Sequence, residues 1–344
     1  RRRTAHLRRT GRDLLSRVAD NLFWLGRYSE RAELSLRVLK VVIERMIDAP
    51  RQDREPELLH SLLSLQLEPP EVPDPSMGAL RSRIVELALD PSAPNGVRPA
   101  LDALYRNAES TRAHLSRDAW RDIGALHAAP IWRTPPEPHR ALSLAGPVEE
   151  AIRSLAAVAG ASHENMTRNF AWRFLELGRR MQRAMGVTAM FRDLVAEARE
   201  NEPATLYALL QLCDSFYAYR SRYMTTPEAT PAIDLLVLDE SNPRSLAFQV
   251  AAMEAVLDAL PRSTPYRNPE HRLVLRLLTD LRISDAAQLG DSDSNGRRPA
   301  LAGLLADAEE TLERVADLIT KAYFAHAELA LTEVATARRT EPDA

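Results

Sequence analysis

The sequence predicts an all-α protein, and three observations support this expectation. The 344 residues include only 12 glycines but 23 prolines, which suits helices with prolines at their starts and in the connecting loops. Apolar residues recur with the period of an α-helix over long stretches. The third observation is a repeat, because the eight-residue segments 25–32 and 177–184 share Leu, Gly, Arg, Arg and Ala at identical spacing. We therefore expect a single elongated multi-helix bundle, with two related halves around a pseudo-twofold axis.

Each helix is expected from its apolar periodicity and from the residues that begin or end it. The first helix ends before Pro50, and a loop rich in proline occupies 68–75. Asn242 is expected to cap a helix whose first position is Pro243. The expected helices are 13–48, 56–67, 77–90, 97–128 with a break near Ser116 left open, 147–165, 170–200, 203–224, 243–260, 269–283 and 299–335, the last two separated by a polar loop at 291–296.

The helical domain is expected to cover residues 13–335. The proline-rich connection at 130–138 would mark a boundary between half-bundles at 13–129 and 139–335. The first 12 residues contain six arginines and predict a basic leader or linker, with a docking arm as the alternative. Residues 336–344 are expected to form a frayed tail. Because the chain does not begin with Met, we expect a domain of a longer polypeptide or an incomplete terminus.

Composition argues against several classes of function. The net charge of −3 leaves no domain-wide basic excess, so we expect no nucleic-acid partner. No apolar run approaches the ~18 residues of a membrane span and no signal peptide is recognisable, so we expect a cytoplasmic protein with no membrane partner. The single cysteine, Cys213, excludes an intramolecular disulfide and a multi-thiolate zinc site. A dimetal bundle needs two Glu-x-x-His units, and only Glu57 with His60 provides one, so no metal site is predicted.

The repeat predicts a site that holds anionic groups. In each copy two arginines lie four residues apart, on one face of a helix. A glycine precedes each pair, and since glycine inside a helix costs about 1 kcal/mol relative to alanine, we expect close approach of another backbone or a ligand at Gly26 and Gly178. Arginine grips carboxylate or phosphate bidentately. The pairs are Arg27 with Arg31 and Arg179 with Arg183.

Carboxylates accompany these arginines. Glu30 lies between the arginines of the first copy, Glu33 lies four residues before Arg37, and Glu176 precedes Arg179 and Arg180. A carboxylate flanked by arginines has a lowered pKa, which suits orienting an arginine or binding an amine better than general base catalysis near neutral pH. The alternative is a salt-bridged helix surface.

Three further segments are candidates for the binding site. Arg168 and Arg173 precede the second arginine pair. Arg220 and Arg222 follow the aromatic residues of segment 214–223, which predicts nucleotide or peptide stacking or else plain helix packing. The loop before the expected helix at 243–260 offers a helix N-terminus, which favours anions, or a simple capping motif. Its candidate residues are Asn242, Arg244 and Gln249.

Together these segments resemble the bacterial alpha-E family, an all-helical domain with Glu and Arg motifs. The resemblance is carried by residues 16–33, 164–168, 172–180 and 242–249, and it extends from about residue 14 to about residue 330. One departure concerns position 182, where the resemblance implies a second glutamate and this chain has Gln182. If both copies needed that carboxylate for proton transfer, the second half would be impaired.

The resemblance implies a partner more than a reaction. Such domains are encoded beside, or fused to, a circularly permuted ATP-grasp protein, often near a transglutaminase-like peptidase and a proteasome-like protease. The set resembles a peptide-ligating system, in which the ATP-grasp partner uses ATP and Mg and this domain binds no cofactor directly.

The leading hypothesis is a domain that binds a carboxylate-bearing peptide or acyl-phosphate intermediate for an amide ligase. Glu30 and Glu176 would orient the ligand or meet an amine, and the remaining candidates would bind it. Two alternatives remain: an enzyme that transfers or hydrolyses an amide with Glu30 as acid and base, and a structural scaffold held by buried ion pairs. The binding candidates are Arg27, Arg31, Glu33, Arg168, Arg173, Arg179, Arg180, Arg183, Arg220, Arg222, Asn242, Arg244 and Gln249.

Overall fold

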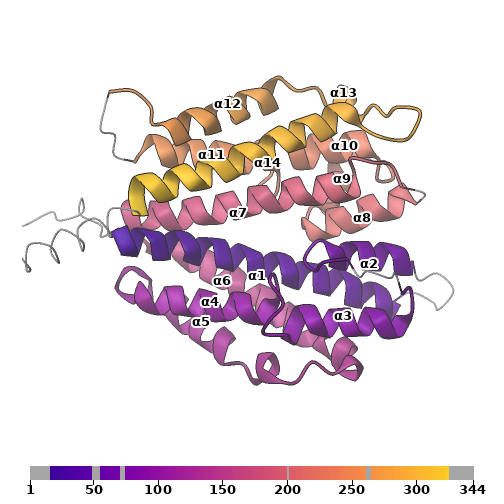
Figure 1. Cartoon of the computed structure of the whole chain (residues 1–344), viewed down its shortest axis with the longest axis horizontal. Coiled ribbons are helices and arrows are strands. Elements are labelled where there is room, and N and C mark those ends of the chain that lie inside the picture. The colour runs from indigo at the N-terminus through magenta and orange to yellow at the C-terminus, as the bar shows by residue number, and fades with distance from the viewer. Residues whose placement is uncertain (1–15, 49–54, 70–73, 200, 261–264, 325–344) are drawn as a thin grey trace, which may run out of the picture.

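Two long helices, α1 (Ser16–Asp48) and α7 (Phe170–Leu194), lie side by side through the middle of the structure (Figure 1). They carry the two copies of the repeat, so the copies pack directly on one another. The structure is a computed structural model that describes residues 16–48, 55–69, 74–199, 201–260 and 265–324. The expected basic leader (1–12), the frayed tail (336–344) and the end of the last expected helix lie outside these residues.

Each central helix belongs to a ring of four helices in which every helix packs on the next. α1 packs on α4 (Val97–Ser110), α4 on α5 (Arg117–Ala128), α5 on α6 (Ala145–Asn165), and α6 again on α1. Likewise, α7 packs on α11 (Leu246–Asp258), α11 on α12 (Pro269–Ile283), α12 on α14 (Pro299–Ile319), and α14 again on α7. The two rings lie on opposite sides of the α1–α7 contact (Figure 1). The expected all-α bundle is thereby confirmed. The two rings divide between α6 and α7, whereas the expected half-bundles divided at the proline-rich connection 130–138.

Shorter elements fill the ends of the rings. They are α2 (Pro56–Ser64), α3 (Met77–Leu89), α8 (Glu202–Leu212), α9 (Phe216–Tyr223), α10 (Ala229–Ile233), α13 (Ala286–Gly290), 3₁₀ turns at Arg112–His114, Pro130–Arg133 and Pro138–Leu144, and π-helical turns at Asp234–Leu238 and Thr320–Phe324.

The repeat glycines are the points of closest approach between α1 and α7. A Cβ atom on Gly26 would lie 2.2 Å from the carbonyl oxygen of Leu175, and one on Gly178 would lie 2.0 Å from that of Phe23. Leu175 corresponds to Phe23 in the repeat, so the two contacts are reciprocal. Further along both helices, Gly186 approaches Leu34, which means that α1 and α7 run in the same direction. The pseudo-twofold axis therefore runs along the pair, between the helices.

Several expected helices end or begin elsewhere, for local reasons. The open break in 97–128 is present, because Ser116 accepts a hydrogen bond from the backbone N–H of Ala119 and starts α5. The single helix expected at 203–224 was wrong: it is interrupted at Asp214, which has a positive φ of 50°. The expected helices at 56–67 and 170–200 end earlier, at Ser64 and Leu194.

The helix expected to begin at Pro243 begins instead at Leu246. Its N-cap is Ser245, whose hydroxyl accepts from the N–H of Phe248 at 3.0 Å. The Asn242 side chain accepts from the N–H of Arg244 at 3.0 Å, which closes a turn before the helix. Asn242 is therefore a turn residue and not the helix cap. The elements α10 and α13 were not expected from the sequence.

Candidate functional site

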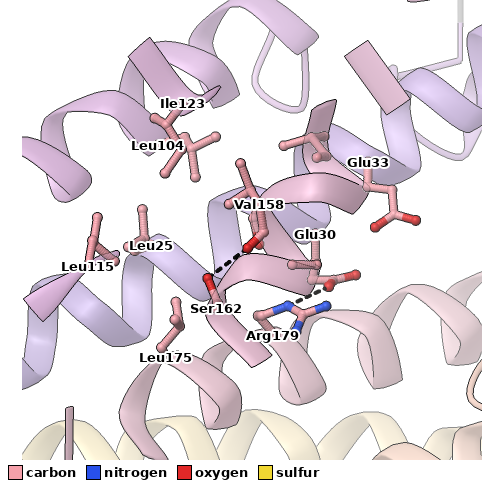
Figure 2. Close-up of a pocket in the computed structure, with 13 residues that line it drawn as sticks. Leu25, Glu30, Glu33, Leu104, Leu115, Ile123, Val158, Ser162, Leu175 and Arg179 are labelled. Atoms are coloured by element: carbon pink, nitrogen blue, oxygen red, sulfur yellow. Dashed lines mark hydrogen bonds and ion pairs between the residues drawn. The ribbon is translucent and has the colours of Figure 1, made fainter. Parts of the chain in front are cut away.

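The arginine pairs of the repeat meet across the α1–α7 contact. Arg179 Nε donates to Glu30 Oε1 at 3.2 Å, and Arg183 Nε donates to Glu30 Oε2 at 2.8 Å. A second guanidinium nitrogen of Arg183 reaches Oε1 at 2.9 Å. Glu30 is 6% exposed, so α7 holds a buried carboxylate of α1 with its two repeat arginines. Figure 2 shows the contact between Glu30 and Arg179 at the edge of a small cavity lined mainly by apolar side chains.

This arrangement extends into a network that we call the Glu30 cluster. Glu33 accepts from Arg37 at 2.8 Å and pairs with Arg244 at 2.8 Å and Arg183 at 3.3 Å. On the other side, Glu176 pairs with Arg179 at 3.2 Å and with Arg180 at 2.6 Å. Arg180 also donates to the buried Gln249 at 3.1 Å. The Glu30 cluster consists of Glu30, Glu33, Arg37, Glu176, Arg179, Arg180, Arg183, Arg244 and Gln249.

Two carboxylates of the Glu30 cluster, Glu33 and Glu176, are held ionised. Burial alone would raise the pKa of Glu33, but Arg244, Arg183 and Arg37 outweigh it and hold that pKa well below its ordinary value. Burial likewise opposes ionisation of Glu176, whose pKa is nevertheless lowered by Arg179 and Arg180. Such carboxylates carry no proton near neutral pH and are weak bases.

The same geometry recurs on the other side of the axis, with one change. Arg27 Nε donates to Gln182 Oε1 at 3.0 Å, and Arg31 Nε donates to the same oxygen at 3.2 Å. Gln182 occupies the repeat position of Glu30, and Met185, which accepts from Arg27 at 3.3 Å, occupies that of Glu33. We call Arg27, Arg31, Gln182 and Met185 the Gln182 cluster. Among the residues that the structure describes, no carboxylate forms an ion pair with either of its arginines.

The pKa values of equivalent arginines reflect this difference. Burial lowers the pKa of Arg183, but Glu30 and Glu33 raise it above its ordinary value. At the equivalent position burial lowers the pKa of Arg31, with only Tyr28 opposing. Burial and the nearby charge of Arg31 lower the pKa of Arg27 to about 10. Arg27 is 8% exposed and remains a cation near neutral pH. The Gln182 cluster therefore concentrates positive charge that the fold does not neutralise.

Aromatic rings replace charges beside the Gln182 cluster. Trp24 and Tyr28 stand at the repeat positions of Glu176 and Arg180. The Arg27 guanidinium lies 4.9 Å from the Trp24 ring centroid, and that of Arg31 lies 5.4 Å from the Tyr28 ring centroid. These contacts orient both guanidinium groups without neutralising them.

Two cavities border the Gln182 cluster, and Arg31 lines both. One has a volume of about 190 Å³ and is also lined by Tyr28 and Arg106. The other, of about 200 Å³, is lined by Gln182 and by two glutamates of α14. By contrast, the cavities that touch Glu30 measure only about 20 and 40 Å³. Cavities of this size hold only about one to three ordered water molecules. Of the two equivalent positions Glu30 and Gln182, the one with space for a ligand beside it is therefore Gln182, while a larger cavity of about 450 Å³ lies further along α1, at Arg37 and Lys40.

The structure gathers most of the predicted site residues into these two clusters. Arg27 and Arg31 lie in one, and Glu30, Glu33, Glu176, Arg179, Arg180, Arg183, Arg244 and Gln249 lie in the other.

Five predicted residues lie outside both clusters. Arg168 stacks over Trp172, Arg173 over Phe170 and Arg220 over Phe216. Arg222 pairs with Asp234 and Asp239. Asn242 donates to the carbonyl oxygen of Leu235 at 3.1 Å within its turn.

Other residues that line or support the Gln182 side were not predicted from the sequence. Gln182 was noted as a departure but not as the acceptor of two arginines, and Trp24, Tyr28, Met185 and Arg106 were not singled out. Comparing each residue of the first copy with the residue 152 positions later would have identified Gln182, Trp24, Tyr28 and Met185. No sequence signal identifies Arg106, which reaches the cavity from α4.

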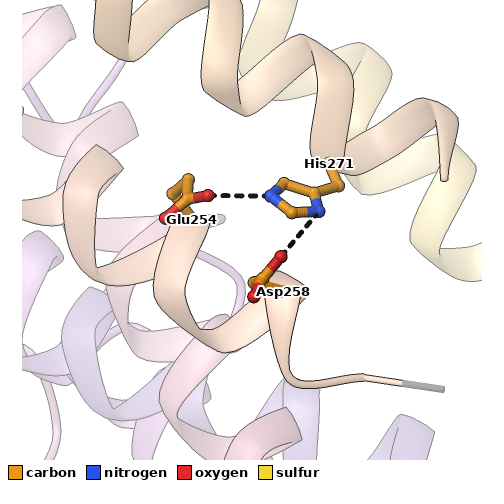
Figure 3. Close-up of side chains that lie close together, drawn as sticks. All are labelled: Glu254, Asp258 and His271. Carbon is orange, nitrogen blue, oxygen red and sulfur yellow. Dashed lines mark hydrogen bonds and ion pairs between the residues drawn. The ribbon is translucent and has the colours of Figure 1, made fainter. Parts of the chain in front are cut away.

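A separate cluster joins α11 to α12 (Figure 3). His271 is buried; its Nε2 lies 2.9 Å from Glu254 and its Nδ1 lies 3.9 Å from Asp258. Among the described residues this is the group with the composition of a metal site. The two carboxylates face different ring nitrogens, whereas one metal ion is bound through a single nitrogen of an imidazole. The arrangement therefore fits a buried histidine hydrogen-bonded to Glu254 between two helices better than a metal centre.

Comparison with known proteins agrees with the helical fold. The family called Alpha-E, described as a predicted alpha-helical domain with a conserved ER motif, matches residues 14–324. Glu30 and Arg31 form such a Glu-Arg pair at the centre of the site. No solved structure matches the chain. None of the helices in the described part of the chain has the length and apolar character needed to cross a membrane.

Curated relatives come from mycobacteria. The uncharacterized proteins Rv2567 of Mycobacterium tuberculosis and Mb2597 of Mycobacterium bovis are each 30% identical over 322 residues, which cover 88% of this chain and 36% of the relative. The chain thus spans about a third of the length of the curated relatives it matches.

Proposed function

The chain belongs to the Alpha-E family of helical domains, and from this premise we propose that it binds a carboxylate-bearing peptide, or the acyl phosphate made from it, in partnership with an ATP-grasp amide ligase. The observation that carries the proposal is the Gln182 cluster, in which the buried Arg27 and the half-buried Arg31 have no ionic partner among the described residues. A buried charge is costly unless it is paired, and a bound anion would supply the pair.

The Glu30 cluster indicates how such an anion would be held. There, two repeat arginines bind both oxygens of one carboxylate with three hydrogen bonds of 2.8–3.2 Å. Arg27 and Arg31 have the same spacing on the opposite helix, and the Nε of each donates a hydrogen bond to Gln182. Arg27 also donates a terminal nitrogen to the Met185 sulfur and lines neither cavity, so the terminal nitrogens of Arg31 are the charge-assisted donors that a ligand can meet. Arg31 borders the cavities through which a ligand would enter.

The ligase partner is proposed from the family and is compatible with the relatives. In the mycobacterial relatives the region similar to this chain takes up 36% of the length, so those proteins have room for further domains. An acyl phosphate is an anionic, water-sensitive intermediate, and a buried arginine pair suits its protection. ATP and Mg would be bound by the ligase.

Calorimetry with two matched peptides tests the binding proposal. N-acetyl-trialanine should bind to the wild-type protein, and its C-terminal amide should bind at least about tenfold more weakly, because only the acid meets the arginines. Gln182→Glu should abolish this preference, because it places an internal carboxylate between Arg27 and Arg31 and copies the Glu30 side. The substitution adds no steric bulk, so the fold should be retained.

Gln211→Glu is the matched control. Gln211 also accepts a hydrogen bond from an arginine, Arg45, at 3.3 Å, but it lies in a different part of the bundle. This variant should bind the acid as the wild type does. Equal binding of acid and amide, or unchanged binding by Gln182→Glu, would contradict the proposal.

The alternative of an amide-transferring enzyme with Glu30 as acid and base has less support. Both oxygens of Glu30 already accept hydrogen bonds from Arg179 and Arg183, so no oxygen is aimed at a ligand. The scaffold alternative fits the Glu30 cluster well, since its arginines are saturated by internal carboxylates. We assign architecture to the Glu30 cluster and binding to the Gln182 cluster.

A further inference from the structure

The two cavities beside the Gln182 cluster are adjoining, because Arg31 and Asn95 line both. The cavity of about 190 Å³ has two guanidinium groups, those of Arg31 and Arg106, and no carboxylate in its lining. It is therefore a place for a negative group. Tyr28 and three loop or helix-start residues, Pro94, Pro99 and Ala100, complete its walls.

The cavity of about 200 Å³ has the opposite character on its far wall. Glu309 and Glu313 are four residues apart on α14 and face this cavity from the second ring. Glu309 is paired with Arg192, and Glu313 is exposed. The rest of the lining is mixed, with apolar side chains such as Leu34, Leu65 and Met185 beside uncharged polar ones such as Gln66 and Thr188.

A ligand that fits both cavities would carry two opposite charges separated by a small, partly apolar segment. A phosphate-rich ligand such as a nucleotide would suit Arg31 and Arg106 but would be repelled by the two glutamates. We propose that the ligand of the Gln182 cluster is a short peptide with both ends free, whose carboxylate lies at Arg31 and Arg106 and whose ammonium group lies at Glu309 and Glu313. This assignment rests on the proposed function and names its substrate class.

Four forms of trialanine test the assignment by calorimetry: the free peptide, the N-acetyl form, the C-terminal amide, and the form blocked at both ends. The free peptide should bind about tenfold more tightly than N-acetyl-trialanine, because acetylation removes the ammonium group. The form blocked at both ends should bind most weakly.

The double variant Glu309→Gln/Glu313→Gln should lose the preference for a free amino end and keep the preference for a free carboxylate. Glu310→Gln is the matched control, because Glu310 lies on the same helix but pairs with Arg314 and does not line the cavity. This control should behave as the wild type. Circular dichroism of each variant checks that the helices remain folded.

The outcomes separate the two proposals. If acetylated and free trialanine bind equally while the amide binds more weakly, the peptide assignment is overturned and the binding function stands. If the double variant retains the amino-end preference, the ammonium group is recognised elsewhere and the assignment is again overturned. If none of the four forms binds, both proposals fail.

Discussion

Gln182 differs from a glutamate only by an amide nitrogen in place of a carboxylate oxygen, and this replacement removes a full negative charge from between two arginines. Its single oxygen accepts from both Arg27 and Arg31, at 3.0 and 3.2 Å. Glu30, at the equivalent position, accepts three hydrogen bonds with two oxygens. The arginines on the Glu30 side of the axis thus share two carboxylate oxygens, whereas those on the Gln182 side share one amide oxygen and retain guanidinium donors for another acceptor.

Gln182→Glu should stabilise the protein. The new carboxylate would neutralise two arginines whose pKa values are lowered by burial, and hydrogen bonds to charged groups contribute about 1.5–3 kcal/mol. We expect the free energy of unfolding in urea to rise by roughly that amount. Glu30→Gln is the reciprocal control and should lower it by about 1.5–3 kcal/mol, because Arg179 keeps Glu176 and Arg183 keeps Glu33 but both lose the charged acceptor between them. A loss of stability in Gln182→Glu would show that the arginines are not short of negative charge.

Acid should destabilise the protein through the Glu30 cluster. Glu33 and Glu176 have folded-state pKa values below the ordinary 4.5, so the unfolded chain binds protons first as the pH falls. Their contribution to stability is complete above about pH 5 and is lost progressively as the pH falls below 4.5. In Glu33→Gln and Glu176→Gln, the slope of unfolding free energy against pH in this range should be smaller. An unchanged slope in both variants would exclude these carboxylates as its source.

The sequence predicted the arginines of the site but not their unequal roles. Helical spacing places Arg27 with Arg31 and Arg179 with Arg183 on one face each, since this depends only on local geometry. Which carboxylate neutralises which arginine depends on how α1 and α7 are aligned. Arg244 and Gln249 reach the cluster because α11 and the turn before it pack on α7, and Arg106 reaches its cavity from α4.

At the scale of elements, the α1–α7 contact depends on two glycines. Gly26→Ala should lower the free energy of unfolding by about 1–3 kcal/mol, because its Cβ would overlap the Leu175 carbonyl oxygen and force the backbones apart. Gly160→Ala is the matched control on α6, where nothing lies within 4 Å of the added Cβ. It should gain up to about 1 kcal/mol from helix propensity. Chemical denaturation of both variants measures the difference, and equal effects would contradict the close approach.

The presence of the helices was predicted from the sequence more accurately than the residues at which they begin and end. The periodicity of α1, α3, α7 and α12 extends over many turns and could be recognised directly. The interruption at Asp214 could not, because a positive φ at a residue other than glycine is imposed by tertiary packing. The start of α11 was misplaced because Asn242-Pro243 is a good capping signal, yet Ser245 is the residue that caps.

At the scale of the molecule, α1 and α7 form the contact that joins the two rings. Each belongs to its own four-helix ring, and the two pack along one another where the rings meet. We therefore expect the central amides of α1 and α7 to exchange hydrogen most slowly, with protection close to the global free energy of unfolding. Mass-spectrometric exchange measures this by segment. Faster exchange in α7 than in α12, an outer helix of the same ring, would argue against a common core.

Two parallel helices related by an axis between them are what a symmetric homodimer would present if its subunits were joined into one polypeptide. In a true homodimer any substitution occurs on both sides at once. A glutamate retained for stability would therefore neutralise the arginine pair on both sides. Duplication within one chain removes that constraint. One copy can keep the salt-bridged version that holds the fold together, while the other diverges to leave an arginine pair open.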